Sequence, residues 1–353
     1  MNTTTHTFKR FNIALLFASL LLVGCSTPVV EEPIINEPIV IPPVVEEPEV
    51  PVVVPQIIRH AFNGQEIASQ QSYQAFAIII SNSKEARPHS GISLADIVYE
   101  VTVDGWAITR FMAVFANEHP TKVGPVRSAR VSFAEILREF KLPFAHFGSA
   151  EIGQGDALTV LRSINLPIRF DAHKGLNDEF YSRDSSRNAP HNAYFNAKNA
   201  LVKIPSLEYE PRFLFDETSS VNDASVSELV LRYSSTNTVK YVYDMQTKKY
   251  KRYINDSAMM DTYNNTHVSV TNIIVLNAPH KDVEAVRYVL VDYIGEGKAE
   301  FYVNGKHEQG TWKQADNTKP TQYFDSSGEQ IVLSPGNTWI QVVHSNVTIT
   351  QKP

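Results

Sequence analysis

The sequence has one cysteine, Cys25, in 353 residues, so no disulfide bond can form within the chain. Stability must therefore come from a hydrophobic core, and the roughly 300 residues after Pro55 are enough for two domains. The sequence also lacks the Cys/His spacing typical of metal sites and any repeat of fixed period. We therefore expect no metal site and no cofactor.

The sequence also has no excess of basic over acidic residues. The formal net charge is −6, and residues 25–55 alone carry six glutamates and no lysine or arginine. The residues outside 25–55 are therefore formally neutral, and without the N-terminal Lys9 and Arg10 their formal charge is about −2. Domains that bind nucleic acid need a clear excess of basic residues. The composition therefore excludes nucleic acid as a partner.

The apolar run near the N-terminus is too short to cross a membrane. Residues 11–23 are uncharged and apolar except for Asn12 and Ser19, whereas a spanning helix needs about 20 apolar residues. A basic pair precedes the run and Gly24-Cys25 follows it, which is the order found in a signal peptide with a lipobox. The pattern predicts a signal peptide over residues 1–24 and cleavage before Cys25. Two acyl chains such as palmitate on Cys25 would hold the protein at the outer face of the cytoplasmic membrane.

The next segment, residues 25–55, is rich in proline, glutamate, valine and isoleucine. It contains no glycine and no basic residue. This composition favours extended, polyproline-like conformations that cannot pack a core. We interpret the segment as a lipidated cysteine followed by a tether.

The first predicted domain covers residues 56–215 and mixes strands with helices. An apolar run at residues 75–80 is typical of a strand that is buried on both faces. Gly124-Pro125 predicts the start of one helix, and Asp156 is the predicted N-cap of another. Further strands are predicted over residues 97–103, 111–115 and 143–147.

The second predicted domain covers residues 216–353 and consists of short β-rich runs. Asn304-Gly305 is the strongest hairpin signal in the chain. Strands are predicted over residues 229–233, 240–243, 272–276 and 287–293. The sequence therefore predicts an α+β fold, with a mixed α/β N-terminal domain before a mainly antiparallel β C-terminal domain.

The segment from Gly124 to Arg130 is the densest candidate site. We expect Arg127, Ser128 and Arg130 in the first turns of a helix, with both arginines on one face. The helix dipole makes an N-terminus positive, so two cations there are unfavourable unless a negative charge lies nearby. A bound phosphate or carboxylate could supply that charge. Internal ion pairs could also supply it. The available internal partners are Asp96, Glu100, Asp104 and Glu135.

Other polar residues could join the same anion site. The further candidates for anion binding are Arg87, Arg110, Arg187, His191 and Asn192. Possible acid or base groups are Asp96, Glu100 and His146. No nucleophile motif accompanies them, so the sequence assigns no catalytic residue.

Several spaced motifs make the chain similar to the YerB-like bacterial lipoproteins. The N-terminal motifs are Arg87-Pro-His-Ser-Gly91, Ala95-Asp-Ile-Val-Tyr-Glu100, Thr109-Arg-Phe111, Gly124-Pro-Val-Arg-Ser-Ala-Arg130 and Ala189-Pro-His-Asn192. The C-terminal motifs are Gly310-Thr-Trp312 and Pro335-Gly-Asn-Thr-Trp-Ile-Gln341. The resemblance covers essentially everything after the tether. It implies a two-domain protein anchored outside the cytoplasmic membrane, and it carries over no catalytic residues because the function of that family is unknown.

A second, looser resemblance concerns the segment from Arg110 to Arg130, the run from Ala145 to Ala150 with the helix after it, and Leu166-Pro-Ile168. These segments are similar to the LytR-CpsA-Psr wall-polymer transferases, whose arginines hold a polyprenyl pyrophosphate. The Arg-Asp pair typical of that motif is absent, because Ala129 and Val131 flank Arg130. This resemblance implies a phosphotransferase or hydrolase that acts on lipid-linked wall precursors.

Three functional hypotheses follow. The first is a cell-envelope accessory factor, non-catalytic or only weakly catalytic, that binds an anionic wall precursor or a wall-synthesis protein through the arginines. The second is the phosphotransferase or hydrolase. The third is a purely structural envelope protein whose arginines are paired internally.

Overall fold

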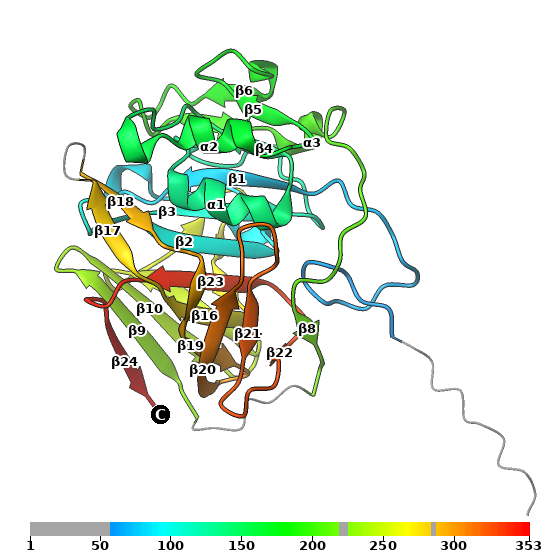
Figure 1. Cartoon of the computed structure of the whole chain (residues 1–353), viewed down its shortest axis with the longest axis vertical. Helices are drawn as coiled ribbons and strands as arrows, with labels where there is room; N and C mark the ends of the chain where they lie inside the picture. The colour runs from blue at the N-terminus through cyan, green and yellow to red at the C-terminus, as the bar shows by residue number, and fades with distance from the viewer. Residues whose placement is uncertain (1–56, 219–224, 284–286) are drawn as a thin grey trace, which may run out of the picture. The chain divides into compact units, whose positions relative to one another are not determined.

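A twelve-stranded mixed sheet forms the centre of the structure (Figure 1). The computed structural model describes residues 57–218, 225–283 and 287–353, which belong to one compact unit. The predicted signal peptide, the predicted lipidation site at Cys25 and the predicted tether lie outside the described residues.

The main sheet joins residues from both halves of the chain. Its strands, in spatial order, are β21 (Gln322–Phe324), β20 (Lys306–Gln314), β19 (Gly295–Val303), β16 (Asn272–Asn277), β23 (Thr338–Val343), β2 (Ile97–Asp104), β3 (Ile108–Phe115), β1 (Phe76–Ser81), β4 (Phe144–His146) and β5 (Arg169–Asp171). The hairpin of β17 (His280–Val283) and β18 (Tyr288–Val291) joins the end of β2, where Tyr288 pairs with Asp104. β23 pairs in parallel with both β16 and β2, so the sheet passes from C-terminal to N-terminal residues without a break.

A second sheet of six strands comes entirely from the C-terminal half. Its strands are β12 (Ser257–Ala258), β11 (Lys249–Ile254), β10 (Asn237–Asp244), β9 (Glu228–Ser234) and β24 (Thr348–Lys352), with β15 (Ser269–Val270) beside β11. Three small sheets pair β13 (Met260–Asp261) with β14 (Thr266–His267), β8 (Leu214–Phe215) with β22 (Val332–Leu333), and β6 (Tyr181–Arg183) with β7 (Ala193–Phe195).

Helices are few and short among the described residues. The α-helices are α1 (Val131–Phe140), α2 (Ala157–Ser163) and α3 (Ala197–Ala200). The 3₁₀ turns are η1 (Lys84–Ala86), η2 (Ile92–Leu94), η3 (Gly153–Gly155) and η4 (Asp178–Phe180). The predicted N-cap of α2 is confirmed, because the Asp156 carboxylate accepts a hydrogen bond of 2.9 Å from the Thr159 N–H.

The core has two parts, one on each face of the main sheet. In β1, Ala77 and Ile79 belong to one part, whereas Phe76, Ile78 and Ile80 belong to the other. Alternate side chains of a strand point to opposite faces, so this strand is buried on both sides, as its apolar run predicts. The apolar face of α1 covers one side of the sheet, and β9, β10 and β11 cover the other (Figure 1).

The predicted helix start at Gly124-Pro125 is wrong. Residues 125–130 are not helical: Val126 and Ala129 form isolated β-bridges, and α1 begins at Val131 with Arg130 in the N-cap position. The backbone N–H groups of this segment bond to other segments, including Val126 N–H to Ala193 C=O and Arg127 N–H to Ile79 C=O. A helix could not form here without giving up these bonds. Arg127 and Arg130 are therefore placed by strand-like pairing and not by a shared helix face.

The predicted hairpin at Asn304-Gly305 is confirmed. β19 and β20 are joined by these two residues, whose φ angles are 53° and 74°. Two consecutive positive φ angles are the signature of the tight turn that asparagine followed by glycine favours. Together with the strands found near the predicted ranges, this confirms the α+β fold class: a mixed sheet with few helices, followed by antiparallel strands.

Candidate functional site

Three arginines gather around the carboxylate of Asp104, at the end of β2. Arg110 Nη2 lies 3.2 Å from Asp104 Oδ2, and Arg130 Nη2 lies 3.2 Å from Asp104 Oδ1. Arg127 is the third member, and its electrostatic neighbours are Arg130, Asp104 and Tyr288. We call Asp104, Arg110, Arg127 and Arg130 the arginine cluster. Asp104 is one of the four internal partners that the sequence makes available.

Strand pairing explains why these residues meet. Arg110 lies in β3 opposite Ser81, the last residue of β1. The N–H of Arg127 bonds to Ile79, two residues before that end of β1. A register shift between Thr102 and Asp104 bends the end of β2, where Asp104 lies opposite Tyr288 of β18.

The guanidinium groups of Arg110 and Arg130 are fixed by further contacts. Arg110 Nη1 donates a short hydrogen bond to the carbonyl oxygen of Ser128. The Arg130 guanidinium carbon stands 4.3 Å from the centre of the Tyr288 ring, which is a cation–π contact. Both arginines are at least nine-tenths buried. These contacts hold two positive charges in fixed positions beside Asp104.

The Arg127 guanidinium group has no comparable contacts. Its Nε is buried and has no hydrogen-bond partner among the described residues. Burial, followed by the neighbouring Arg130, lowers the pKa of Arg127, and Asp104 opposes this effect. Burial and Arg130 also lower the pKa of Arg110. Arginine stays charged in proteins, so the arginine cluster holds three positive charges against one carboxylate.

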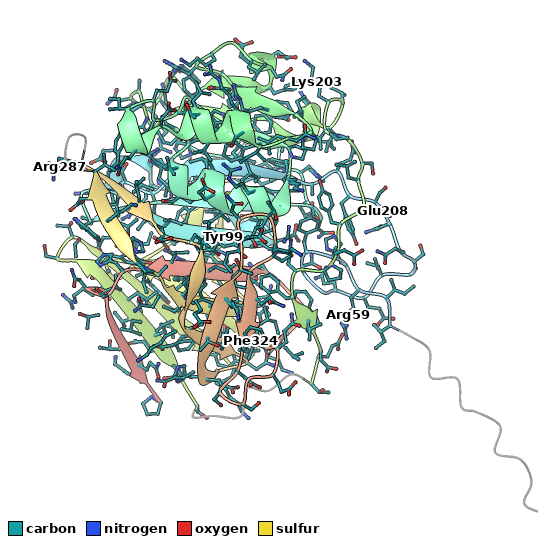
Figure 2. The ribbon with its side chains drawn as sticks, viewed as in Figure 1. Arg59, Tyr99, Lys203, Glu208, Arg287 and Phe324 are labelled. Carbon is teal, nitrogen blue, oxygen red and sulfur yellow. The ribbon has the colours of Figure 1, made fainter. Side chains whose placement is uncertain are left out.

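A cavity opens beside the cluster. Its volume is about 300 Å³, and its lining residues are Asp104, Gly105, Ala107, Ile108 and Arg287. Arg287 is exposed and lies at the edge of the molecule beside the β17–β18 hairpin (Figure 2). The cavity therefore gives solvent a path to the Asp104 side of the cluster and adds a fourth arginine at its rim.

His191 lies close to the same charges. Its Nδ1 is 3.4 Å from Ser81 Oγ and 3.5 Å from Ser83 Oγ. Burial, followed by the positive charge of Arg127, lowers the pKa of His191. The imidazole is therefore neutral at pH 7, and it can offer a hydrogen bond without adding to the positive charge.

Comparison with known proteins identifies the family. Residues 62–210 match the model of the N-terminal domain of a protein of unknown function, DUF3048, and residues 229–340 match its C-terminal domain. The chain belongs to the DUF3048 family. The predicted likeness to YerB-like lipoproteins is thereby confirmed.

Two comparisons with YerB of Bacillus subtilis support this assignment. The chain is 32% identical over 275 residues to a protein of strain 168 named "Putative lipoprotein YerB", covering 76% of this chain and 80% of that protein. The crystal structure of YerB from Bacillus subtilis has a TM-score of 0.71 at 27% identity. The match covers 83% of this chain and 99% of the crystallised relative, so nearly all of that structure has a counterpart in this DUF3048 protein.

The remaining candidates for anion binding lie apart from the Asp104 carboxylate. Arg187 donates to the carbonyl oxygens of Glu85, Arg87 and Pro88 and to the Tyr194 hydroxyl. These bonds tie it to the backbone of the 85–88 loop. The Asn192 amide accepts from Arg183 and donates to the Arg187 carbonyl. Arg87 donates to Asn82 and lines a separate cavity.

The three possible acid or base groups are buried and held by structural contacts. Asp96 accepts hydrogen bonds from the N–H groups of Ala116 and Asn117. Glu100 pairs with Arg252, and both side chains are inaccessible to solvent. His146 is fully buried, with its Nδ1 2.8 Å from the Gly148 carbonyl oxygen. These contacts argue for structural roles for all three residues in this DUF3048 protein.

Sequence reasoning missed Tyr288, Arg287 and the serine pair Ser81 and Ser83. Tyr288 and Arg287 come from β18 and its start, more than 150 residues along the chain from Arg130. No local motif marks them. Among the described residues, no helix is long and apolar enough to span a bilayer, and no group of three or more metal-ligating side chains occurs.

Proposed function

We propose that this DUF3048 lipoprotein is an accessory factor of the cell envelope that binds an anionic ligand through the arginine cluster. The observation that carries the proposal is the excess of three guanidinium groups over one carboxylate in a largely buried site. Uncompensated buried charge is costly, and a bound phosphate or carboxylate would offset it. Arg127 and Arg130 each supply a free donor, because the Nε of each is buried and has no hydrogen-bond partner among the described residues.

The proposed location is the outer face of the cytoplasmic membrane, with the lipid on Cys25. The relative's printed name describes a lipoprotein, and the order of charged, apolar and small residues before Cys25 is that of a lipobox signal peptide. An anionic wall precursor, free or presented by a wall-synthesis protein, is the ligand that such a position makes available. In a Cys25→Ser variant, we expect radiolabelled palmitate incorporation to be lost and the longer precursor to accumulate.

Titration calorimetry with pyrophosphate tests the anion site. We expect the protein to bind pyrophosphate, and Arg127→Ala to weaken binding by about 10- to 100-fold, which corresponds to one charge-assisted hydrogen-bonding group. Arg162→Ala is the matched control, because Arg162 is exposed on α2 and its loss removes the same charge. Equal binding by the wild-type protein and Arg127→Ala would exclude the arginine cluster as the anion site.

The same samples separate a binding protein from an enzyme. A phosphotransferase or hydrolase would release phosphate from a polyprenyl pyrophosphate in the presence of Mg²⁺, and Arg127→Ala would reduce that rate. A binding protein would retain the substrate unchanged. We expect retention, since the acid and base candidates are buried away from the cluster.

A further inference from the structure

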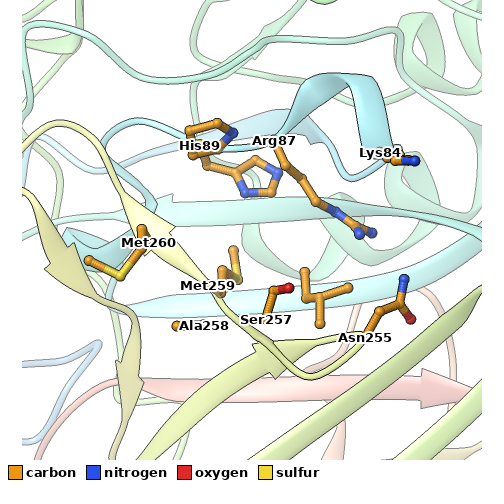
Figure 3. Close-up of a pocket in the computed structure, with 10 residues that line it drawn as sticks. Lys84, Arg87, His89, Asn255, Ser257, Ala258, Met259 and Met260 are labelled. Atoms are coloured by element: carbon orange, nitrogen blue, oxygen red, sulfur yellow. The ribbon is translucent and has the colours of Figure 1, made fainter.

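A second cavity, separate from the arginine cluster, lies between the turn at residues 84–89 and the β11–β12 hairpin (Figure 3). Its volume is about 580 Å³, which is within the range typical of small-molecule sites, roughly 300–1,000 Å³. We call it the Arg87 cavity. Its lining residues are Lys84, Arg87, Pro88, His89, Ile254, Asn255, Ser257, Ala258, Met259 and Met260.

One wall of the Arg87 cavity is positively charged. Arg87 Nη2 donates to the Asn82 carbonyl oxygen at 2.7 Å, which fixes the guanidinium group, and Lys84 is exposed beside it. Burial, followed by repulsion from Arg252, lowers the pKa of Arg87 to about 10, so this arginine remains charged at neutral pH. None of the lining residues is acidic.

His89 adds no charge to this wall. Its Nε2 donates to the Ser81 carbonyl oxygen at 2.8 Å, and its side chain is completely buried. Burial lowers the pKa of His89 to about 3. The imidazole is therefore neutral at ordinary pH. Lys84 and Arg87 are the two positive charges of this wall, and no lining residue supplies a carboxylate to pair with them.

The opposite wall is largely apolar. Ile254 and Met259 are buried, Met260 is half-buried and Ala258 is exposed. Met259 is fixed at its sulfur, which accepts a hydrogen bond of 3.1 Å from Arg252. Methionine side chains fill irregular spaces and adapt to flexible partners. Figure 3 shows Ala258 and Met259 on the side of the cavity opposite Lys84 and Arg87.

We propose that the Arg87 cavity binds an anionic amphiphile, a molecule with one acidic head group and an apolar chain. The head group, a phosphate or a carboxylate, pairs with Lys84 and Arg87, and the chain covers Ala258, Met259 and Met260. A small polar anion would leave Ala258 and Met260 in contact with water, and an uncharged chain would leave both cations unpaired. The proposal rests on residues outside the arginine cluster and is independent of it.

A series of alkyl phosphates tests the proposal directly. The fragment from Pro55 is suitable because it forms a compact unit, and the crystallised relative, 99% of which aligns to this chain, folds without further residues. Hexyl, octyl and decyl phosphate are titrated below their micelle concentrations. We expect about fourfold tighter binding for each methylene that enters the cavity. Decyl maltoside, which has the same chain and no charge, should bind at least about tenfold more weakly than decyl phosphate.

Two variants probe the two walls separately. Ala258→Trp fills the apolar side, and we expect it to weaken decyl phosphate binding by about tenfold or more. Val202→Trp is its control, because Val202 is 82% exposed and does not line the cavity. Lys84→Glu reverses the charge of the head-group site and should weaken decyl phosphate binding while leaving decyl maltoside unaffected. Lys198→Glu, an exposed charge reversal on α3, controls for net charge.

Two further measurements complete the test. Equal binding of decanoate and decyl phosphate assigns the site to acidic amphiphiles in general, and a preference for the phosphate assigns it to phosphate-bearing lipids. In Arg127→Ala, which removes one donor of the arginine cluster, decyl phosphate binding should still depend on chain length and on Lys84, so failure of the arginine cluster as an anion site would not affect this result. Affinity that does not increase with chain length, or that survives both Ala258→Trp and Lys84→Glu, would overturn the proposal.

Discussion

Arg252 of β11 and Glu100 of β2 form an ion pair in which both side chains are inaccessible to solvent. The two residues are 152 positions apart and belong to different sheets. Glu100 also accepts hydrogen bonds from Asn82 and Thr109, and Arg252 donates to the Tyr241 hydroxyl. This polar network connects the six-stranded sheet to the main sheet through a core that is otherwise apolar.

We predict that Arg252→Met destabilises the fold strongly. Removal of one partner leaves the other charge buried and unpaired, which costs about 3–5 kcal/mol. Urea denaturation followed by circular dichroism measures the free energy of unfolding. The double variant Glu100→Gln/Arg252→Met removes both charges and should recover part of the loss. If the double variant is as unstable as the sum of both single variants, the two side chains do not interact.

A second prediction concerns the balance of charge in the arginine cluster. Asp104→Asn removes the one carboxylate that pairs with both Arg110 and Arg130, and we expect a loss of about 2–4 kcal/mol in the free energy of unfolding. Arg127→Ala relieves repulsion and should change stability by less than about 0.5 kcal/mol. Thermal denaturation without added anions compares the stability of Asp104→Asn with that of Arg127→Ala. A large loss in Arg127→Ala would show that Arg127 is a structural residue.

The turn of the β19–β20 hairpin provides a third prediction. Gly305 has φ 74°, and a Cβ there would lie 2.6 Å from the Tyr243 ring. Gly328 has φ 88°, but no atom lies within 4 Å of the corresponding position. Gly328→Ala should therefore lower the free energy of unfolding by about 1–2 kcal/mol, the strain of a left-handed backbone at alanine. Gly305→Ala should lower it further, because the Tyr243 ring must also move. Equal losses in chemical denaturation would contradict this ranking.

Local patterns in the sequence predict the strands and the tight turns well. The run at residues 75–80 alternates between two cores, and the Asn304-Gly305 pair has the backbone that its residue types favour. In both cases the deciding interactions lie within a few residues, or depend only on how apolar the segment is. The parallel pairing of β23 with β2 has no such signal, because it joins residues more than 230 positions apart.

The candidate site shows the limits of local patterns more clearly. Gly124-Pro125 has the residue types of a helix start, but the N–H groups that follow bond to β1 and to residue 193. The choice of Asp104 over Asp96, Glu100 and Glu135 as partner depends on strand register, and the Tyr288 contact depends on a hairpin far along the chain. The sequence motif identifies an arginine-rich site. Which arginines share a carboxylate depends on how distant strands pair in the folded protein.

The last prediction concerns pH and the buried Glu139 on α1. Its carboxylate lies 3.9 Å from Arg212 Nη1 and accepts a hydrogen bond of 2.6 Å from the Thr321 N–H. Burial nevertheless raises the pKa of Glu139 to about 7. Between about pH 4.5 and 7 the folded protein binds a proton that the unfolded chain has lost, so folding is favoured at the lower pH. The stabilisation from this group is present below about pH 4.5 and is lost as the pH rises through 7.

Glu139→Gln isolates this effect from all other titrating groups. At 1.36 kcal/mol per pH unit, the stability of the wild-type protein relative to the variant should fall by about 3 kcal/mol between pH 4.5 and 7. Urea denaturation at half-unit intervals of pH measures the difference. Glu208→Gln removes an exposed carboxylate and is the matched control (Figure 2). A constant difference between wild type and Glu139→Gln across this range would mean that Glu139 is ionised in the folded protein, stabilised by Arg212 and Thr321 despite its burial.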